Sequence, residues 1–275
     1  MNQHPIQSRG AVWLAALTRN APRVAGYPAA LQVVDAELAG RPARYLAVVP
    51  DPDNRFPRVR HGEVGLEEGW QLARAVREAI DADADAGRDD KRAIVAVIDV
   101  ASQAYGRREE AYGIHLALAA AADAYASARL AGHPVLGLIV GKAMSGAFLA
   151  HGYQANRLIA LDDAGVMVHA MGKAAAARVT QRSVEELERL AESVPPMAYD
   201  IANFASLGLL WRLLRVENAA APGSADLDTV ESALSAALAD IAAEPSRGLA
   251  GRLGAAPRQA SLTVRERLRA QWNVA

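Results

Sequence analysis

The spacing of apolar and polar positions divides the chain into alternating strands and helices. Continuous apolar, β-branched runs at Ala93–Ile98 and Val135–Val140 are typical of strands that are buried on both faces. Over Leu66–Ile80 the apolar residues instead recur at helical spacing, with Arg and Glu on the opposite face. Because the order strand, loop, helix is repeated along the chain, the sequence predicts an α/β fold.

The remaining elements follow from the same patterns and from the Gly and Pro residues that interrupt them. We expect further strands at Leu31–Leu38, Arg44–Val49, Leu158–Ala160 and Val166–His169, and further helices at Ala11–Leu17, 109–131, 146–153, Val184–Ser193, Pro196–Leu214, Leu227–Ala243 and Thr263–Trp272. These elements suggest an N-terminal arm (1–29), one main domain (30–243) and a C-terminal loop and helix (244–275).

Composition narrows the classes of function. At 275 residues the chain can bury a large core, and its net charge of -1, with interspersed signs, argues against nucleic acid binding. Cysteine is absent and the six His residues lack the spacing of metal ligands, so we expect no disulfide, thiol nucleophile or metal site. No apolar run is long enough to span a bilayer, and the short apolar stretch after the N-terminus lacks a convincing cleavage site. We therefore expect a cytoplasmic protein that does not associate with membranes.

Two loops rich in small residues join a buried strand to a helix, at 99–106 and at 141–147. Gly146 and Ala147 fall at the start of the second helix. Unpaired N–H groups there, reinforced by the helix dipole, would face any oxygen that develops negative charge. The turn is therefore a candidate oxyanion hole, although small residues also occur where a strand and a helix simply pack closely.

These loops also carry a family resemblance. The segment from Ala93 to Lys173 resembles the carboxyltransferase halves of acetyl-CoA and propionyl-CoA carboxylases, in the crotonase superfamily. Their order of strand, Asp-x-Pro-Gly loop, Glu-containing helix start, Pro, strand and Gly-x-x-x-Gly-Gly-Ala turn is matched by 99–106, Glu110, Pro134 and 141–147. The whole chain is further similar to the gamma subunits of biotin-independent malonate decarboxylase, most distinctly through Gly-Lys-Ala-Met-Ser-Gly-Ala-Phe (141–148) and His-Ala-Met-Gly-Lys (169–173).

The sequence departs from the carboxylase pattern in both loops. Ala101-Ser102 replaces the Pro-Gly pair of the first loop, and Ser145-Gly146 replaces the Gly-Gly pair of the second. The Ala-Met-Lys-Met motif that carries biotin is missing. Its absence agrees with an enzyme that does not use biotin, and it is equally expected of any separate transferase subunit.

The resemblance implies a crotonase/ClpP-like spiral of β-β-α units with flanking helices, occupying residues 30–243. It implies decarboxylation of a malonyl thioester to the acetyl thioester and CO₂, at a site shared with a homologous beta subunit. The substrate would be carried on the phosphopantetheine-type arm of an acyl carrier protein subunit, and this chain would bind no cofactor of its own. An alpha transferase subunit is the third expected partner.

The resemblance also suggests roles for individual residues. The turn at Ser145, Gly146 and Ala147 would stabilise the enolate oxygen through backbone N–H groups. A second pair of donors, for the carboxylate or the nascent CO₂, would be Ser102 and Gln103. The candidates for the proton donor are Tyr105, Glu110, His151 and His169, with His169 preferred. The residues expected to bind substrate are Tyr105, Gly106, Lys142 and Met144, with Lys142 facing a phosphate of the carrier's arm.

The sequence also allows two other interpretations. Gly-Lys-Ala-Met-Ser-Gly-Ala (141–147) and Val-Met-Val-His (166–169) look like the nucleophile turn and histidine strand of Clp-type serine peptidases, with Ser145 and His169 as the reactive pair. Against this hypothesis, no acidic residue stands at the expected place shortly after His169, and the first Asp that follows His169 is Asp200. In the second alternative hypothesis, the chain mainly scaffolds a catalytic partner.

Overall fold

A mixed sheet of seven strands forms the centre of the computed structural model, which describes residues 8–244, 246, 248–249, 252 and 256–272. The strands are β1 (Leu31–Leu38), β2 (Arg41–Val48), β3 (Ala93–Val100), β4 (Val135–Met144), β5 (Arg157–Leu161), β6 (Met167–His169) and β7 (Arg212–Leu214). Their order is β1-β2-β3-β4-β5-β7, with β6 paired to the far end of β4. Only β1 and β2 pair in antiparallel fashion among these strands, so the α/β prediction is confirmed.

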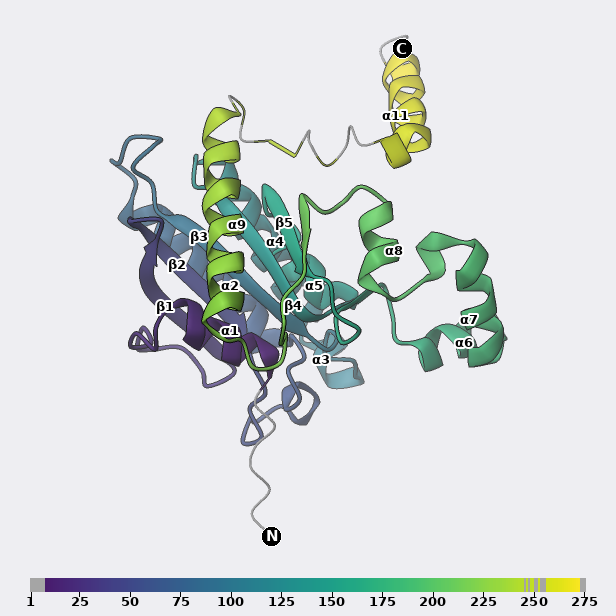
Figure 1. Cartoon of the computed structure of the whole chain (residues 1–275). Coiled ribbons are helices and arrows are strands. Elements are labelled where there is room, and N and C mark those ends of the chain that lie inside the picture. Colours follow the sequence, from purple (N-terminus) through teal and green to yellow (C-terminus); the bar gives the residue numbers. More distant parts are fainter. Residues whose placement is uncertain (1–7, 245, 247, 250–251, 253–255, 273–275) are drawn as a thin grey trace.

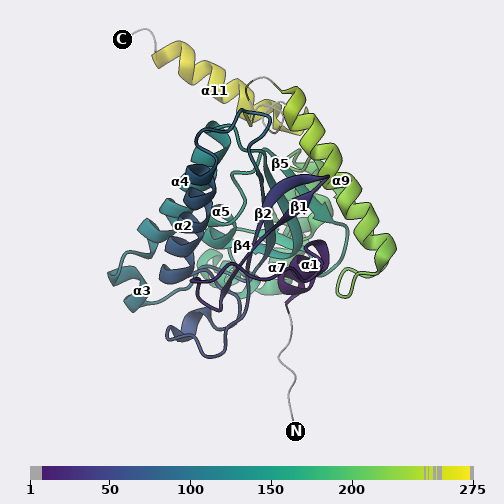
Figure 2. The same cartoon turned by 90° about the vertical axis from the view of Figure 1, so that its left-hand side faces the viewer.

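Helices cover both faces of this sheet (Figures 1 and 2). On one face α2 (Leu66–Ala82) packs beside α4 (Ile114–Leu130), and on the other lie α1 (Arg9–Leu17) and α9 (Ser224–Ala243). The short α3 (Arg107–Ala111) and α5 (Ser145–Ala150) follow the ends of β3 and β4. The group α6 (Lys173–Thr180), α7 (Val184–Ser193) and α8 (Ile201–Ser206) lies beside the sheet, and α11 (Gln259–Trp272) extends from the body (Figure 1).

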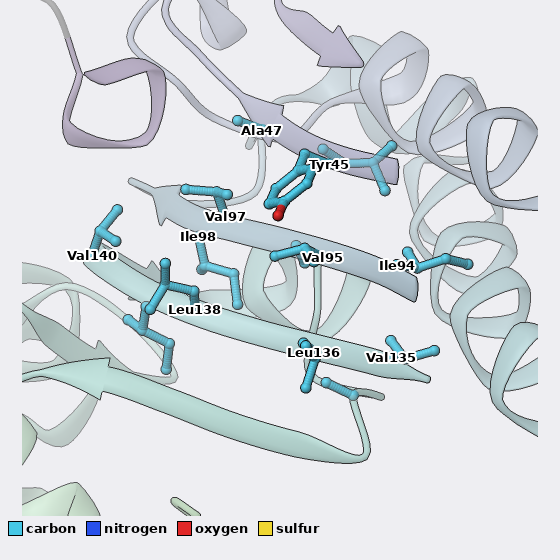
Figure 3. Close-up of a cluster of buried hydrophobic side chains, with 14 of the residues drawn as sticks. Tyr45, Ala47, Ile94, Val95, Val97, Ile98, Val135, Leu136, Leu138 and Val140 are labelled. Atoms are coloured by element: carbon cyan, nitrogen blue, oxygen red, sulfur yellow. The ribbon is translucent and has the colours of Figure 1, made fainter. Parts of the chain in front are cut away.

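The core lies where β2, β3 and β4 run side by side (Figure 3). The β-branched runs predicted for buried strands are indeed inaccessible to solvent, as Ile94, Ile98 and Ile139 illustrate. Small side chains such as Ala75 and Ala121 let the helices approach the sheet and one another closely. A sheet covered on both faces exposes its loops only at the strand ends, so the carboxyl ends of β3 and β4 are where a site can form.

The predicted helix over 109–131 is wrong in its first part. The chain forms α3, breaks at Gly113 and resumes as α4. Gly113 adopts a left-handed conformation with φ of 80°, which glycine reaches at little energetic cost and which ends a right-handed helix. The short α6 was not predicted from the sequence.

The predicted helix over Pro196–Leu214 is also wrong. Pro195–Met197 forms a single 3-10 turn, α8 follows, and Gly208 then takes a left-handed φ of 73°. Arg212–Leu214 is a strand, β7, in parallel register with β5. The free edge of β5 supplies backbone hydrogen-bond partners, and these outweigh the helical stripe of apolar residues.

Some expectations reach beyond the described residues. Residues 1–7 of the expected N-terminal arm lie outside them, as do parts of the expected loop at 244–257. Among the helices that are described, none combines the length and the apolar character needed to cross a membrane.

The pairing of β3 with β4 shifts just before the two strands end. The register passes from Ile98 opposite Ile139 to Val100 opposite Ala143, so a single residue, Asp99, faces three on β4. The Asp99 carboxylate fills the offset by accepting hydrogen bonds from the N–H groups of Lys142 (3.0 Å) and Gly10 (3.3 Å). A Cβ on Gly141 would lie 2.1 Å from Asp99 Oδ1, so only glycine fits there without displacing the carboxylate. The offset sets where β4 turns into α5.

His151, just after α5, lies in the core. Its Nδ1 is 3.0 Å from the Tyr125 hydroxyl and its Nε2 is 3.1 Å from the Val97 carbonyl. Burial lowers the pKa of His151 to about 4, because a charged imidazole would lose its hydration. The folded protein therefore holds this ring neutral at pH values where the unfolded chain protonates it.

We expect His151 to make the fold less stable in mild acid. The unfolded histidine, with a pKa of about 6.5, takes up a proton before the folded one does, so the free energy of unfolding falls by about 2 kcal/mol from about pH 7 to about pH 5. Urea unfolding of the wild type and of His151→Gln at both pH values measures this contribution. A His151→Gln variant that keeps the full pH dependence would contradict the assignment.

Candidate functional site

The turn between β4 and α5 holds Ser145 in a strained backbone conformation. Its φ is 60°, a left-handed value that a residue other than glycine adopts at a cost of about 1–2 kcal/mol. Met144 precedes it in extended conformation, and Gly146 and Ala147 continue the first turn of α5. Ser145 is 9% exposed and Ala147 is fully buried. The turn therefore aims the Ser145 side chain and the Gly146 N–H toward the loop that follows β3.

Backbone hydrogen bonds pin that neighbouring loop, residues 101–105, to residues 62–64. Val64 N–H donates to the Ser102 carbonyl (2.9 Å), and Ala104 N–H donates to the Val64 carbonyl (2.9 Å). Ala101 N–H donates to the Gly62 carbonyl (3.2 Å). None of these bonds uses the N–H groups of Ser102 or Gln103. The bonds therefore fix the loop backbone and leave these two N–H groups as potential donors.

The side chain of Gln103 connects the two loops. Gly146 N–H donates to Gln103 Oε1 at 3.2 Å, and Ser145 Oγ lies 3.4 Å from the same oxygen. A Cβ on Gly146 would fall 2.1 Å from that oxygen, so the amide fills the space that a side chain at 146 would occupy. The turn predicted to bind a developing oxyanion is thus in contact with a carbonyl oxygen of the protein itself.

Tyr105 is the third side chain of this group, beside Ser145 and Gln103. Its hydroxyl lies 2.5 Å from Ser145 Oγ, while the residue remains 49% exposed. The sequence predicted that Tyr105 belongs to the site. Its hydrogen bond to Ser145 was not predicted.

His169 ends β6, directly opposite Met144 in the register with β4. Its Nδ1 is 3.0 Å from the Met171 carbonyl, which can only accept, so Nδ1 carries the proton of the neutral ring. Met171 N–H also lies 3.3 Å from Nδ1, but that longer contact requires the opposite tautomer. The ring stacks on Tyr199 with centroids 3.9 Å apart. Burial lowers the pKa of His169, which leaves Nε2 unprotonated near neutral pH.

Two of the four candidate proton donors are accounted for by their own surroundings. Both ring nitrogens of His151 contact Tyr125 and Val97 in the core, so the structure contradicts His151 as a candidate proton donor. Glu110 is an exposed residue in the first turn of α3, a position that a carboxylate favours through the helix dipole. Tyr105 and His169 remain.

The other residues expected to bind substrate, Met144, Gly106 and Lys142, differ from one another in exposure and contacts. Met144 is buried beneath the turn, with 5% of its surface exposed. A Cβ on Gly106 would lie 2.2 Å from Glu109 Oε2, so Gly106 faces side chains of its own chain. Lys142 is exposed at the end of β4.

Lys142 lines a cavity of about 1300 Å³ between α1 and the carboxyl ends of the strands. Ser8, Arg9, Arg60, Asp99 and Gly141 are among its other residues. Ser145, Gly146, Gln103 and Tyr105 do not line it. The hydrogen-bond geometry, and not the size of this cavity, therefore identifies the site.

Sequence reasoning also missed the roles of Asp99 and of the Gln103 side chain. Asp99 belonged to the matched motif, yet its link to Gly10 crosses 89 positions of sequence. In the part of the chain that is described, no group of three or more His, Asp or Glu residues is arranged to hold a metal ion.

Comparison with known proteins relates this geometry to a family. The family model of the malonate decarboxylase gamma subunit matches residues 59–272. One chain of a Pseudomonas malonate decarboxylase hetero-tetramer in complex with coenzyme A is 69% identical, with a TM-score of 0.92 over 96% of this chain and 100% of that one. One chain of the Pseudomonas malonate decarboxylase MdcD-MdcE hetero-dimer is 66% identical, with a TM-score of 0.89 over the same shares.

Two more distant proteins extend the comparison. The malonyl-S-ACP:biotin-protein carboxyltransferase MADD of Malonomonas rubra is 34% identical over 203 residues, 74% of this chain. The chain spans 66% of the length of that relative. Transcarboxylase 12S, at 20% identity and a TM-score of 0.61 over 84% of this chain and 41% of its own, shares the fold.

Proposed function

The chain belongs to the malonate decarboxylase gamma-subunit family, and from this premise we propose that it stabilises the enolate formed when a malonyl thioester loses CO₂. The observation that carries the proposal is the hydrogen bond from Gly146 N–H to Gln103 Oε1. An amide carbonyl and a thioester carbonyl present the same kind of acceptor. A turn that holds one at 3.2 Å has the geometry to hold the other.

The reaction needs such a donor. Loss of CO₂ leaves two electrons on the α-carbon, and these delocalise onto the thioester oxygen as an enolate. A backbone donor fixed by a strand and a helix needs no reorganisation as that charge develops, and one such donor is worth about 10²–10³ in rate. Substrate would displace the Gln103 amide, whose backbone is pinned to Val64 while its side chain can rotate.

Other site residues enter the proposal with specific tasks. Ala147 N–H is the neighbouring backbone donor in the same turn. Ser102 and Gln103 N–H groups would hold the carboxylate or the departing CO₂, since the bonds that pin their loop leave them available. Lys142 would meet an anionic group of the carrier's arm, and the half-exposed Tyr105 would border the acyl group. Gly106 and Met144 face their own chain and would support the loop and the turn from within.

The partners and the carrier are also part of the proposal. We infer a shared site with a beta subunit, supported by the Pseudomonas hetero-dimer and by exposed apolar side chains near the site. Trp70, Tyr112, Leu116 and Leu149, each about half exposed or more, lie on α2, α4 and α5 and on the link from α3 to α4. An acyl carrier protein would present the substrate on a phosphopantetheine-type arm, and an alpha transferase would load it.

The Malonomonas relative suggests a second candidate reaction. Its name couples malonyl-S-ACP to a biotin protein, so the carboxyl group there is transferred. The Pseudomonas malonate decarboxylase chains are about twice as similar to this chain, at 66–69% identity, which favours protonation of the enolate without biotin. The Clp-type alternative is not favoured, because the hydrogen bonds observed for Ser145 Oγ lead to Tyr105 and Gln103.

Activity should require the partner. The purified chain alone is expected to show no turnover of malonyl thioester on the acyl carrier protein, because half of the proposed site is missing. The complex with a beta subunit is expected to release CO₂ and acetyl thioester in equal amounts, and avidin should not inhibit it. Full turnover by the single chain would contradict a shared site, and inhibition by avidin would favour the carboxyltransferase reaction.

The oxyanion assignment predicts a steric effect at Gly146. In Gly146→Ala the new methyl group would lie 2.1 Å from the place where Gln103 Oε1 now lies and where the substrate carbonyl oxygen would bind, so the two would clash. We expect kcat of the complex to fall by about 10²-fold or more, measured as CO₂ release. Gly172→Ala is the matched control, because a Cβ there meets nothing within 4 Å. Equal rates in the two assembled variants would remove Gly146 from the mechanism.

The proton donor to the carbanion is proposed to be His169. Because its Nδ1 proton is engaged by Met171, His169 can deliver a proton only from Nε2, after taking one up. Burial lowers its pKa, so the protonated form is populated below the ordinary value of about 6.5 and is lost as pH rises. The wild-type kcat should therefore fall with rising pH. His169→Gln should be slower by about 10²–10⁴-fold and independent of pH. A wild-type profile without this fall would exclude His169 as the donor.

A further inference from the structure

Three oxygen atoms form a continuous chain at the site. The Tyr105 hydroxyl lies 2.5 Å from Ser145 Oγ, which in turn lies 3.4 Å from Gln103 Oε1. Gly146 N–H reaches the same Oε1 at 3.2 Å. Two donors, one from the backbone and one from a side chain, can thus converge on a single carbonyl oxygen.

Two atoms in this chain have a fixed role, the Gly146 N–H and the Gln103 carbonyl oxygen, and the direction of the other hydrogen bonds follows from them. A backbone N–H only donates, so the Gln103 atom that faces Gly146 is the oxygen and not the amide nitrogen. A carbonyl oxygen only accepts, so Ser145 must donate its proton to it. The Ser145 proton is then engaged, and Tyr105 must be the donor in the bond to Ser145.

From this geometry we propose that the Ser145 hydroxyl is a second oxyanion donor beside Gly146, and that Tyr105 is a positioning residue that orients and polarises it. The inference rests on the proposed function, in which the thioester oxygen replaces Gln103 Oε1. A hydroxyl that accepts a hydrogen bond becomes a stronger donor, so the contact with Tyr105 strengthens the bond from Ser145 to the enolate oxygen.

The backbone at Ser145 fits this role. Its φ of 60° would be relaxed with glycine, but glycine would remove the hydroxyl. The residue is 9% exposed, so its donor meets little competition from water. Strain held at a nearly buried position beside a charged intermediate is expected where the side chain contributes to binding that intermediate.

The same direction of donation argues against Ser145 as a nucleophile. A nucleophilic serine gives its proton to a neighbouring base. Here Tyr105 donates to Ser145, and the acceptor of the serine proton is an amide oxygen, which is a poor base. The hydroxyl is arranged to stabilise charge on a ligand and not to attack one.

A double-mutant cycle in the assembled complex, with malonyl thioester on the acyl carrier protein, tests the proposal. Ser145→Ala should lower kcat by about 10²-fold and Tyr105→Phe by about tenfold, each with KM changed by less than about threefold. Because Tyr105 acts through Ser145, adding Tyr105→Phe to Ser145→Ala should lower kcat no further. Ser145→Gly, which relieves the backbone strain, should lose as much activity as Ser145→Ala.

The controls separate the ways in which this can fail. Tyr27→Phe removes a tyrosine hydroxyl that is hydrogen-bonded to Glu78, away from the site, and should keep the wild-type rate. Full activity in Ser145→Gly and Ser145→Ala would overturn the donor role, and additive losses in the double variant would overturn the coupling through Tyr105. A wild-type complex that does not decarboxylate the thioester would instead refute the proposed function on which both rest.

Discussion

The offset between β3 and β4, filled by the Asp99 carboxylate, determines the geometry of the site. β4 runs past the end of β3 and pairs with β6 through its last three residues. The same carboxylate contacts Gly10 at the start of α1, so the N-terminal helix is fastened to the strand that carries the site. Beyond the offset, Ser145 contacts Gln103 in the loop after β3, and His169 lies opposite Met144.

Local patterns predicted the elements whose hydrogen bonds are local or whose burial is complete. β1 and α7 have the predicted bounds, and the buried runs in β3 and β4 are strands as expected. The predictions failed where a distant segment decided the outcome, as at β7, whose apolar stripe suggested a helix but whose backbone pairs with the edge of β5. Gly113 is a local feature whose meaning was missed. This glycine, within an Ala-rich stretch, takes the left-handed conformation that separates α3 from α4.

The site was predictable to the level of its loops and not of its contacts. Sequence placed Gln103, Tyr105 and Gly146 in loops or at a helix start that follow buried strands, and it placed His169 at the end of a strand. It assigned Gln103 a backbone role only, because nothing in the sequence indicates that its side chain spans the gap to Gly146. The sequence could not distinguish His151 from His169 for the same reason. Only the packing shows that both ring nitrogens of His151 have hydrogen-bond partners in the core and that His169 keeps Nε2 available.

The exposure of Tyr105 connects the chemistry of the site to assembly. Charge stabilisation by N–H and O–H donors is strong only where water is excluded, because water competes for the same acceptor and raises the local dielectric constant. Ser145 is shielded by its own chain, but half of the Tyr105 side chain remains open to solvent. A partner surface that covered Tyr105 would exclude water from the solvent-facing side of the hydrogen bonds that link Tyr105, Ser145 and Gln103. Each of these hydrogen bonds would then be stronger. The apolar side chains on α2, α4 and α5 give such a surface something to pack against, so partner binding and activation of the donors would be one event.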